Sequence, residues 1–178
     1  MPITGPEVDD WIDEMSVLAT RFVAGFEAAY GYPPGENHVS RASGGSGGEL
    51  LAGALGDASA SELRTFFSRV ARVSLPDVGS GFFVHPVEHV VEGLRGVNQP
   101  TRVVSTDDRE IVVFGSDGGG ALFAADRRTG EIVRLGDGAL LGEVFKVDEA
   151  EVQVIAQDLG GFLRFLHGEL LRHMPAGP

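Results

Sequence analysis

The chain has 178 residues, 43% of them hydrophobic, which suffices for one domain over residues 1–178 with a sizeable core. Its 14 basic and 26 acidic residues give a formal net charge of −12, which disfavours nucleic acid and anionic lipid as partners because both require clustered Lys and Arg. The chain has no cysteine, no apolar run near the ~18 residues of a membrane span and no secretory signal pattern, so we expect a cytoplasmic protein without disulfides or thiolate metal ligands.

A long amphipathic helix is predicted over residues 7–30, because apolar residues recur there at spacings of three and four. Thr4 and Glu7 have the spacing of a capping box at its start. Its apolar stripe consists of Val8, Trp11, Ile12, Met15, Leu18, Ala19, Phe22 and Phe26. Any apolar surface that stays exposed on this helix would also allow two copies of the chain to form a homodimer.

Residues 31–58 are rich in Gly, Pro and Ser and show no period, so we interpret them as a mobile loop before a core formed by residues 59–174. A second helix is predicted to begin at Ser59, which has capping-box spacing to Glu62, and to continue to about Val70. Pro76 then favours an extended backbone at Leu75.

Short strands dominate the following region. They are predicted at 82–84, 101–105, 110–115, 121–125, 131–135 and 143–147, and the short turns between most of them favour antiparallel pairing. Pro86 is predicted to open a third helix that ends near Leu94, and a last helix is predicted over residues 152–174. The expected fold is therefore α+β, with a central, mostly antiparallel sheet of four to six strands covered by helices.

Two motifs could carry chemistry. His85, Glu88 and His89 match the H-x-x-E-H pattern of inverted zinc peptidases, in which both His and the Glu share one helix face. We expect no metal here, because Pro86 at the first helical position would make His85 the cap and turn it away from that face. The glycine run 115–120 resembles a phosphate loop, but a strand follows it and Asp117 would repel phosphate, so hairpin geometry explains the glycines better.

The block Ile111–Asp126 resembles the central block of the SUKH superfamily, which consists of a strand, a glycine-rich turn and a strand ending near an Asp. Leu75-Pro76-Asp77 is similar to the Leu-Pro element of that family, and residues 130–135 are similar to its next strand. Residues 155–163 are similar to its closing helix. The resemblance covers roughly residues 60–170, although Gly79–Phe83 replaces the usual Asn-Gly stretch.

This resemblance implies an α+β fold and a non-enzymatic role without a cofactor. Bacterial members of the superfamily are commonly immunity proteins that bind and neutralise toxins, often nucleases, whereas yeast relatives act in cell-wall signalling through protein contacts. The leading hypothesis is therefore an immunity-like protein that covers the active site of a toxin, and the acidic charge is compatible with a basic toxin domain. A regulatory scaffold or adaptor for a host protein is the alternative, and a hydrolase built on His85, Glu88 and His89 ranks below both.

Exposed turns often carry binding residues, so the candidate contacts lie at or near the predicted turns. For each one, simple turn chemistry is the competing explanation. We expect charge reversal at Asp117 or Asp126 to weaken partner binding without lowering the melting temperature. The candidates are Asp77, Phe82, Asp117, Gly118, Asp126, Arg127 and Arg128.

Overall fold

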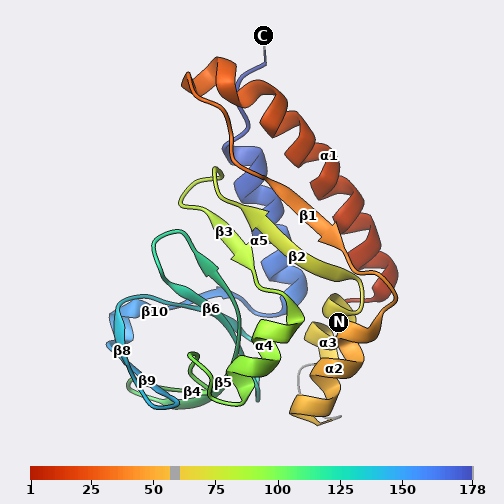
Figure 1. Ribbon diagram of the computed structural model, residues 1–178. Helices are drawn as coiled ribbons and strands as arrows, with labels where there is room; N and C mark the ends of the chain where they lie inside the picture. The colour runs from red at the N-terminus through yellow and green to blue at the C-terminus, as the bar shows by residue number, and fades with distance from the viewer. Residues whose placement is uncertain (57–60, 178) are drawn as a thin grey trace.

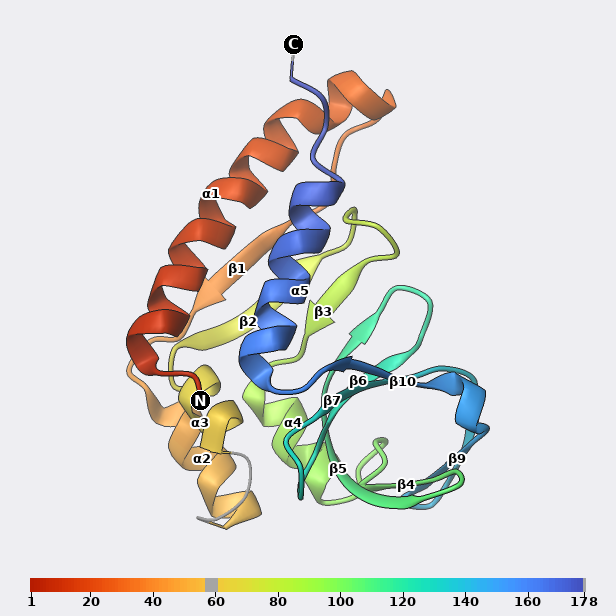
Figure 2. The ribbon, with the colours of Figure 1, turned by 180° about the vertical axis from the view of Figure 1, so that it is seen from behind.

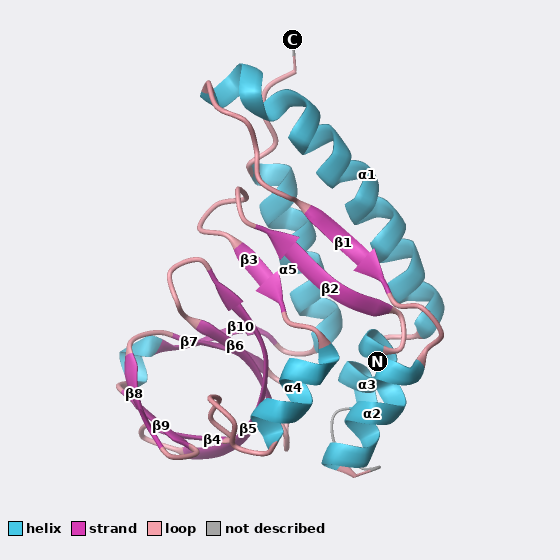
Figure 3. Cartoon of the chain, in the orientation of Figure 1, coloured by secondary structure: helices cyan, strands magenta, loops and turns pink. Residues whose placement is uncertain are grey.

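The computed structural model describes residues 1–56 and 61–177, which form helices and strands in mixed order (Figures 1 and 3). In chain order the elements are α1 (Gly5–Tyr30), β1 (His38–Arg41), α2 (Ser46–Leu55), α3 (Ser61–Phe67), β2 (Val70–Leu75), β3 (Phe82–Val84), α4 (Val87–Leu94), β4 (Arg102–Val104), β5 (Asp108–Asp117), β6 (Leu122–Asp126), β7 (Ile132–Leu135), β8 (Gly138–Leu141), β9 (Val144–Val147), the 3-10 helix η1 (Glu149–Glu151), β10 (Val152–Ala156) and α5 (Leu159–Arg172).

The long first helix forms as its periodicity predicts, and all eight residues of the apolar stripe are buried. Both hydrogen bonds of the capping box between Thr4 and Glu7 are present. The Thr4 hydroxyl and then the Thr4 backbone N–H, which both donate to the Glu7 carboxylate, lower the pKa of that carboxyl. The helix ends at Gly31, whose φ of 80° lies in the left-handed region that suits glycine. No helix within residues 1–56 or 61–177 is long and apolar enough to cross a membrane.

Helices α1 and α5 lie side by side over one face of strands β1, β2 and β3, as the views from both sides show (Figures 1 and 2). Trp11 of α1 donates its indole N–H to the carbonyl oxygen of Leu163 in α5 at 3.0 Å, which fixes the two helices against each other. We call this part, with its shared core, the helix-covered half. The α+β class and the antiparallel sheet are thus confirmed.

The remaining strands, β4 to β10, curl into a ring beside the helix-covered half (Figure 3). Strand β5 belongs to both parts: its C-terminal end pairs with β3, its middle with β6 and its N-terminal end with β4. The parallel pairing of β4 with β9 continues the curl to β8, so the ring stays open between the unpaired edges of β8 and β10. A second, smaller core fills it, formed by Val103, Ile111, Val113, Ala124, Val133, Leu135, Phe145 and Val147.

The expected size of the sheet is wrong, because ten strands of the described chain join one sheet rather than four to six. Among them β1, β8 and β10 were not predicted, and β2 was predicted only as an extended segment around Leu75. Strand β1 and helix α2 lie in residues 31–58, which we interpreted as a loop, while residues 57–58 and the predicted cap Ser59 lie outside the described residues. The glycines at the start of α2 have a packing role, since a Cβ at Gly48 would lie 2.6 Å from the carbonyl oxygen of Arg64 in α3.

Two predicted helix boundaries are also wrong. The second helix ends at Phe67, and Val70 begins the strand β2 instead of continuing the helix. The last helix begins at Leu159, where the side chain of Asp158 accepts a hydrogen bond from the N–H of Gly161 at 2.7 Å. Residues 152–156 form β10 because they pair with β7, and a bulge between Val154 and Ala156 breaks strict strand alternation.

Candidate protein-binding surfaces

The seven candidate contacts lie in three places. Asp117 and Gly118 form the turn between β5 and β6, whereas Asp126, Arg127 and Arg128 form the turn between β6 and β7. Asp77 and Phe82 lie around the turn between β2 and β3. The first and the third of these places adjoin, because Phe82 pairs with Asp117 and the N–H of Gly118 donates to the carbonyl oxygen of Gly81, whereas the second lies at the other end of β6. The structure therefore divides the candidates between two places rather than one.

Asp117 is buried, although it belongs to a hairpin turn. One of its carboxylate oxygens accepts hydrogen bonds from the N–H groups of Gly119 and Ala121, both at 2.9 Å. The other oxygen accepts from Nε of Arg134 at 2.9 Å and pairs with the outer guanidinium nitrogen at 2.7 Å. Asp117 thus organises the turn and ties it to β7, so charge reversal should lower the melting temperature, contrary to the sequence-based expectation.

Gly118 is exposed, but its backbone is held against the β2–β3 turn. Its N–H donates to the carbonyl oxygen of Gly81 at 3.1 Å, and a Cβ at this position would overlap the carbonyl oxygen of Ser80. Gly120 closes the hairpin with a φ of 92°. The glycines therefore serve turn geometry and close backbone approach, as we predicted when we rejected a phosphate loop.

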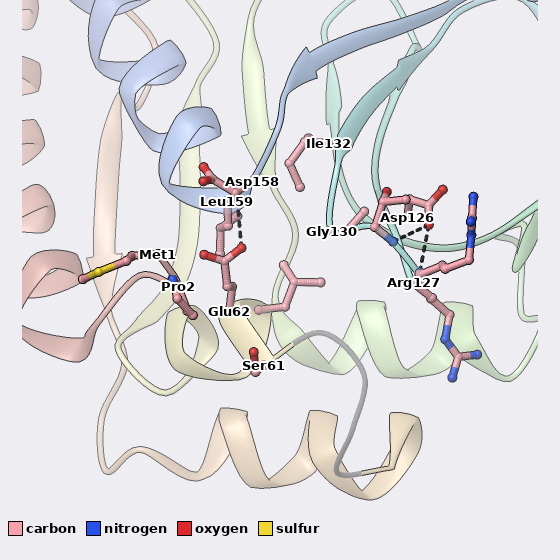
Figure 4. Close-up of a pocket in the computed structure, with 14 residues that line it drawn as sticks. Met1, Pro2, Ser61, Glu62, Asp126, Arg127, Gly130, Ile132, Asp158 and Leu159 are labelled. Carbon is pink, nitrogen blue, oxygen red and sulfur yellow. Dashed lines mark hydrogen bonds between the residues drawn. The ribbon is translucent and has the colours of Figure 1, made fainter.

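Asp126, Arg127 and Arg128 line a pocket of about 330 Å³ between the β6–β7 turn, the start of α3 and the start of α5 (Figure 4). The buried Asp126 accepts hydrogen bonds from the N–H groups of Arg128 and Thr129, at 2.8 and 3.0 Å. Because this carboxylate already holds the turn, its charge reversal should also destabilise the fold. Arg128 is the exposed side chain of the three.

Glu62 closes the opposite wall of this pocket (Figure 4). Its two carboxylate oxygens accept hydrogen bonds from the N–H groups of Ile3, at 2.9 Å, and Leu159, at 3.2 Å. It thereby joins the start of the chain, α3 and α5. The pocket carboxylates consequently have structural partners, and the pocket is chiefly a junction between elements.

Asp77 and Phe82 line a different cleft, of about 550 Å³, at the C-terminal ends of α1 and α5. Asp77 accepts hydrogen bonds from the side chain of Asn37 at 2.6 Å and from the N–H of Gly35 at 2.7 Å, whereas Phe82 is buried against Phe165. The exposed side chains of this cleft include Tyr30 and Tyr32, from α1 and the turn that follows it, and Arg172 of α5, beside the smaller Ser80. Exposed tyrosine and arginine are enriched in protein interfaces.

The H-x-x-E-H residues do not converge. His85 lies one residue before the helix cap, which is Pro86, and its Nε2 lies 3.1 Å from Oγ of Ser116 in β5. Burial, with a smaller contribution from the charge of His89, lowers the pKa of His85. Glu88 and His89 are exposed, and the described residues contain no group of three His, Asp or Glu side chains that could hold a metal ion.

Sequence reasoning missed a further surface, at the margin of the ring. All four residues of β8 are exposed, and Leu140 and Leu141 keep 43% and 55% of their surface accessible. Carboxylates flank the strand. We call β8, together with Asp137, Glu143, Asp148 and Glu149, the acidic edge. The signal that could have revealed it is the two-residue turn Gly142-Glu143, because glycine with a positive φ suits the first central position of a hairpin turn.

The charges of the acidic edge are largely unopposed. Asp137, Glu143 and Asp148 form no ion pair within the described part of the chain, and Lys146 is the basic residue between them in sequence. The hydroxyl of Ser105 and the backbone N–H of Thr106 donate hydrogen bonds to the carboxylate of Glu149. Hydrogen bonds from Ser105 and Thr106 lower the pKa of this carboxyl and keep it anionic. This margin therefore combines exposed leucines with a negative field.

No protein-family model matches the chain, and a search of curated protein sequences found no match.

Proposed function

We propose that the chain is a non-enzymatic protein-binding domain of the immunity type, which neutralises a basic toxin domain by covering its active site. The observation that carries the proposal is the acidic edge, where exposed leucines lie among unpaired carboxylates. Apolar contacts supply affinity in such an interface, while the surrounding charges steer a basic partner and speed its association. The resemblance of Ile111–Asp126 to the SUKH superfamily supports the same role.

The test is rescue of a host cell from toxicity. A basic toxin domain that binds this chain would be expressed from an inducible promoter, with and without the chain. We expect growth to resume when both are produced, and the two proteins to elute together at low salt and separate more readily at high salt. Growth arrest that persists while both proteins are present would contradict the proposal.

A matched pair of variants tests the acidic edge itself. The triple variant Asp137→Asn, Glu143→Gln and Asp148→Asn removes three exposed charges from the edge, and we expect it to lose rescue. The control, Asp10→Asn, Glu27→Gln and Glu36→Gln, removes the same net charge from exposed positions outside the edge. Equal rescue by both variants would show that only the total charge matters.

The cleft at the ends of α1 and α5 favours the alternative function, a scaffold or adaptor that binds a host protein. Tyr30 and Tyr32 are 49% and 55% exposed there, and both rings pack on Phe26. If this cleft binds the partner, Tyr30→Ala with Tyr32→Ala abolishes complex formation, whereas the edge variant leaves it intact. Val17→Ala, which alters an exposed apolar residue elsewhere on α1, is the control.

A further inference from the structure

We infer that β8 is a docking strand, and that an extended basic segment of a partner protein adds to its free edge as a further strand of the sheet. The inference rests on the proposed function and specifies how the partner is bound. Strand addition satisfies backbone groups of both chains, so a free strand edge defines the class of ligand more narrowly than an apolar patch does.

The direction of the backbone groups follows from the hairpin. Leu141 pairs with Val144 across the two-residue turn, and hydrogen-bonded pairs alternate with non-bonded pairs along an antiparallel ladder. The carbonyl oxygen of Glu143 accepts hydrogen bonds from the N–H groups of Thr101, just before β4, and of Arg102 in β4, so alternation turns the backbone groups of Phe145 toward β4 as well. Within the hairpin, the backbone groups of Leu141 and Ala139 are therefore the ones that bond to β9. The N–H and C=O groups of Leu140 and Gly138 point the other way, toward the free edge of β8.

The other two strand edges are protected. Strand β1 lies beside α1, and Arg41 at its end forms an ion pair with Asp13 of that helix at 2.7 Å. Strand β10 carries the bulge between Val154 and Ala156, which disturbs regular pairing. Strand β8 has a regular register with β9 and contains neither proline nor a charged residue. It is therefore the edge that is best prepared to accept another strand.

Charge selects the occupant. Asp137 and Asp148 lie at one end of the β8–β9 hairpin, and Glu143 lies in the turn at the other end. A second copy of this chain would bring like charges together across the new pair of strands, which is destabilising. A segment with Lys or Arg at its ends and apolar residues in its middle would match both the carboxylates and the exposed Leu140 and Leu141.

The probe for this inference is the acetylated and amidated peptide Lys-Lys-Val-Thr-Val-Lys-Lys, added to the full isotope-labelled chain. We expect NMR shift changes centred on β8 and slower hydrogen exchange of the Gly138 and Leu140 amides. A peptide with Glu in place of each Lys should bind at least about tenfold more weakly. The same holds for the basic peptide N-methylated at the threonine and at both valines, because neither edge of its middle can then donate backbone hydrogen bonds.

Variants of β8 provide the second measurement. Leu140→Pro removes an outward N–H without removing a bond to β9, and we expect at least about tenfold weaker peptide binding. Because proline can also disturb the strand, Leu140→Lys is made in parallel; it keeps the backbone and blocks a basic segment by repulsion. Val154→Lys, which places the same charge at an exposed position of β10, is the control and should bind normally.

Three results of the peptide and exchange measurements would overturn the inference: equal binding of the acidic peptide, shift changes away from β8, or protection of the β8 amides that grows with concentration of the chain alone. The last would identify a second copy as the occupant. Rescue from the toxin that survives in Leu140→Pro would also reject β8 while leaving the proposed function intact. Failure of the unaltered chain to rescue, together with peptide binding at β8, would instead reject the proposed function alone.

Discussion

The helix-covered half and the ring are built on one sheet, but different side chains fill them. The largest fully buried side chains of the described residues, including seven phenylalanines, belong mostly to the core of the helix-covered half. The ring core consists mainly of aliphatic residues from Val103 to Val147, with Phe145 as its aromatic member. Large aromatic residues bury more area and contribute more to stability. We therefore expect the helix-covered half to contribute most of the free energy of folding. The free edge of β8 belongs to the ring, which contributes less.

The largest expected effect tests the helix-covered half directly. Phe162 of α5 is fully buried, with its ring centroid 5.2 Å from those of both Phe114 and Phe123. Phe162→Ala should lower the free energy of unfolding by about 4 kcal/mol, through lost burial and the cavity that remains. Urea denaturation measures this change. A loss below about 1 kcal/mol would show that this core is not the main source of stability.

Asp117 lies where the two parts meet, and its removal should be nearly as costly. Asp117→Ala leaves the N–H groups of Gly119 and Ala121 and the guanidinium of Arg134 without their acceptor, so we expect a loss of about 3 kcal/mol. Asp137→Ala, an exposed carboxylate without an ion pair, is the control and should change stability by less than about 0.5 kcal/mol. A melting temperature unaffected by Asp117→Ala would return this residue to the list of surface contacts.

A substitution in the ring core shows whether the two parts unfold together. Val133 of β7 is fully buried in the ring, and Val133→Ala should cost about 2 kcal/mol for the two lost methyl groups and the space they leave. We expect faster amide hydrogen exchange in β6 and β7, with exchange in α1 little changed. A uniform increase across α1 and the ring would instead describe one cooperative unit.

Elements with a strong local signal could be predicted from the sequence, whereas elements that depend on tertiary neighbours could not. The first helix repeats its apolar spacing over many turns, so its period and its capping box sufficed. The two hairpins that β5, β6 and β7 form between Ile111 and Leu135 were found through their turn residues. Strand β10 was missed because Val152, Ile155 and Ala156 have helical spacing, and only pairing with β7 decides against a helix. Helix α2 was missed because its glycines indicate a linker until the backbone of α3 is placed against them.

For the candidate contacts, turn chemistry placed the turns correctly but did not predict which of their side chains are exposed. Asp117 is buried because of Arg134, which lies 17 residues away, and Gly118 is held by Ser80 and Gly81, which come from another turn. Such neighbours are set by the tertiary fold, and no local pattern contains them. The exposed leucines of β8 were missed for the opposite reason: consecutive apolar residues indicate burial, and here the strand has no covering layer.

A smaller and stabilising effect is expected in α5. Gly168 lies on the exposed side of this helix, and a Cβ there would meet no atom within 4 Å. Gly168→Ala should therefore stabilise the protein by about 1 kcal/mol, because alanine loses less backbone entropy in a helix. Gly118→Ala is the counterpart at the contact between the two turns and should destabilise. A thermal melt of both variants gives the signs directly.

The smallest expected effect concerns pH and the contact of His85 with Ser116. Burial lowers the pKa of His85, so the unfolded chain takes up this proton at a higher pH than the folded chain does. His85 therefore does not reduce the stability above its ordinary pKa of 6.5. As the pH falls from 6.5 through the lower pKa of the folded state, protonation of the unfolded chain lowers the free energy of unfolding. His85→Gln should flatten this part of the stability profile.

An NMR titration of the imidazole of His85 measures the same shift in the folded chain. His89→Gln should move the pKa of His85 only part of the way back toward 6.5, because burial is the larger cause and the charge of His89 the smaller one. A full return in His89→Gln would make the neighbouring charge, and not burial between β3, α4 and β5, the reason that His85 resists protonation.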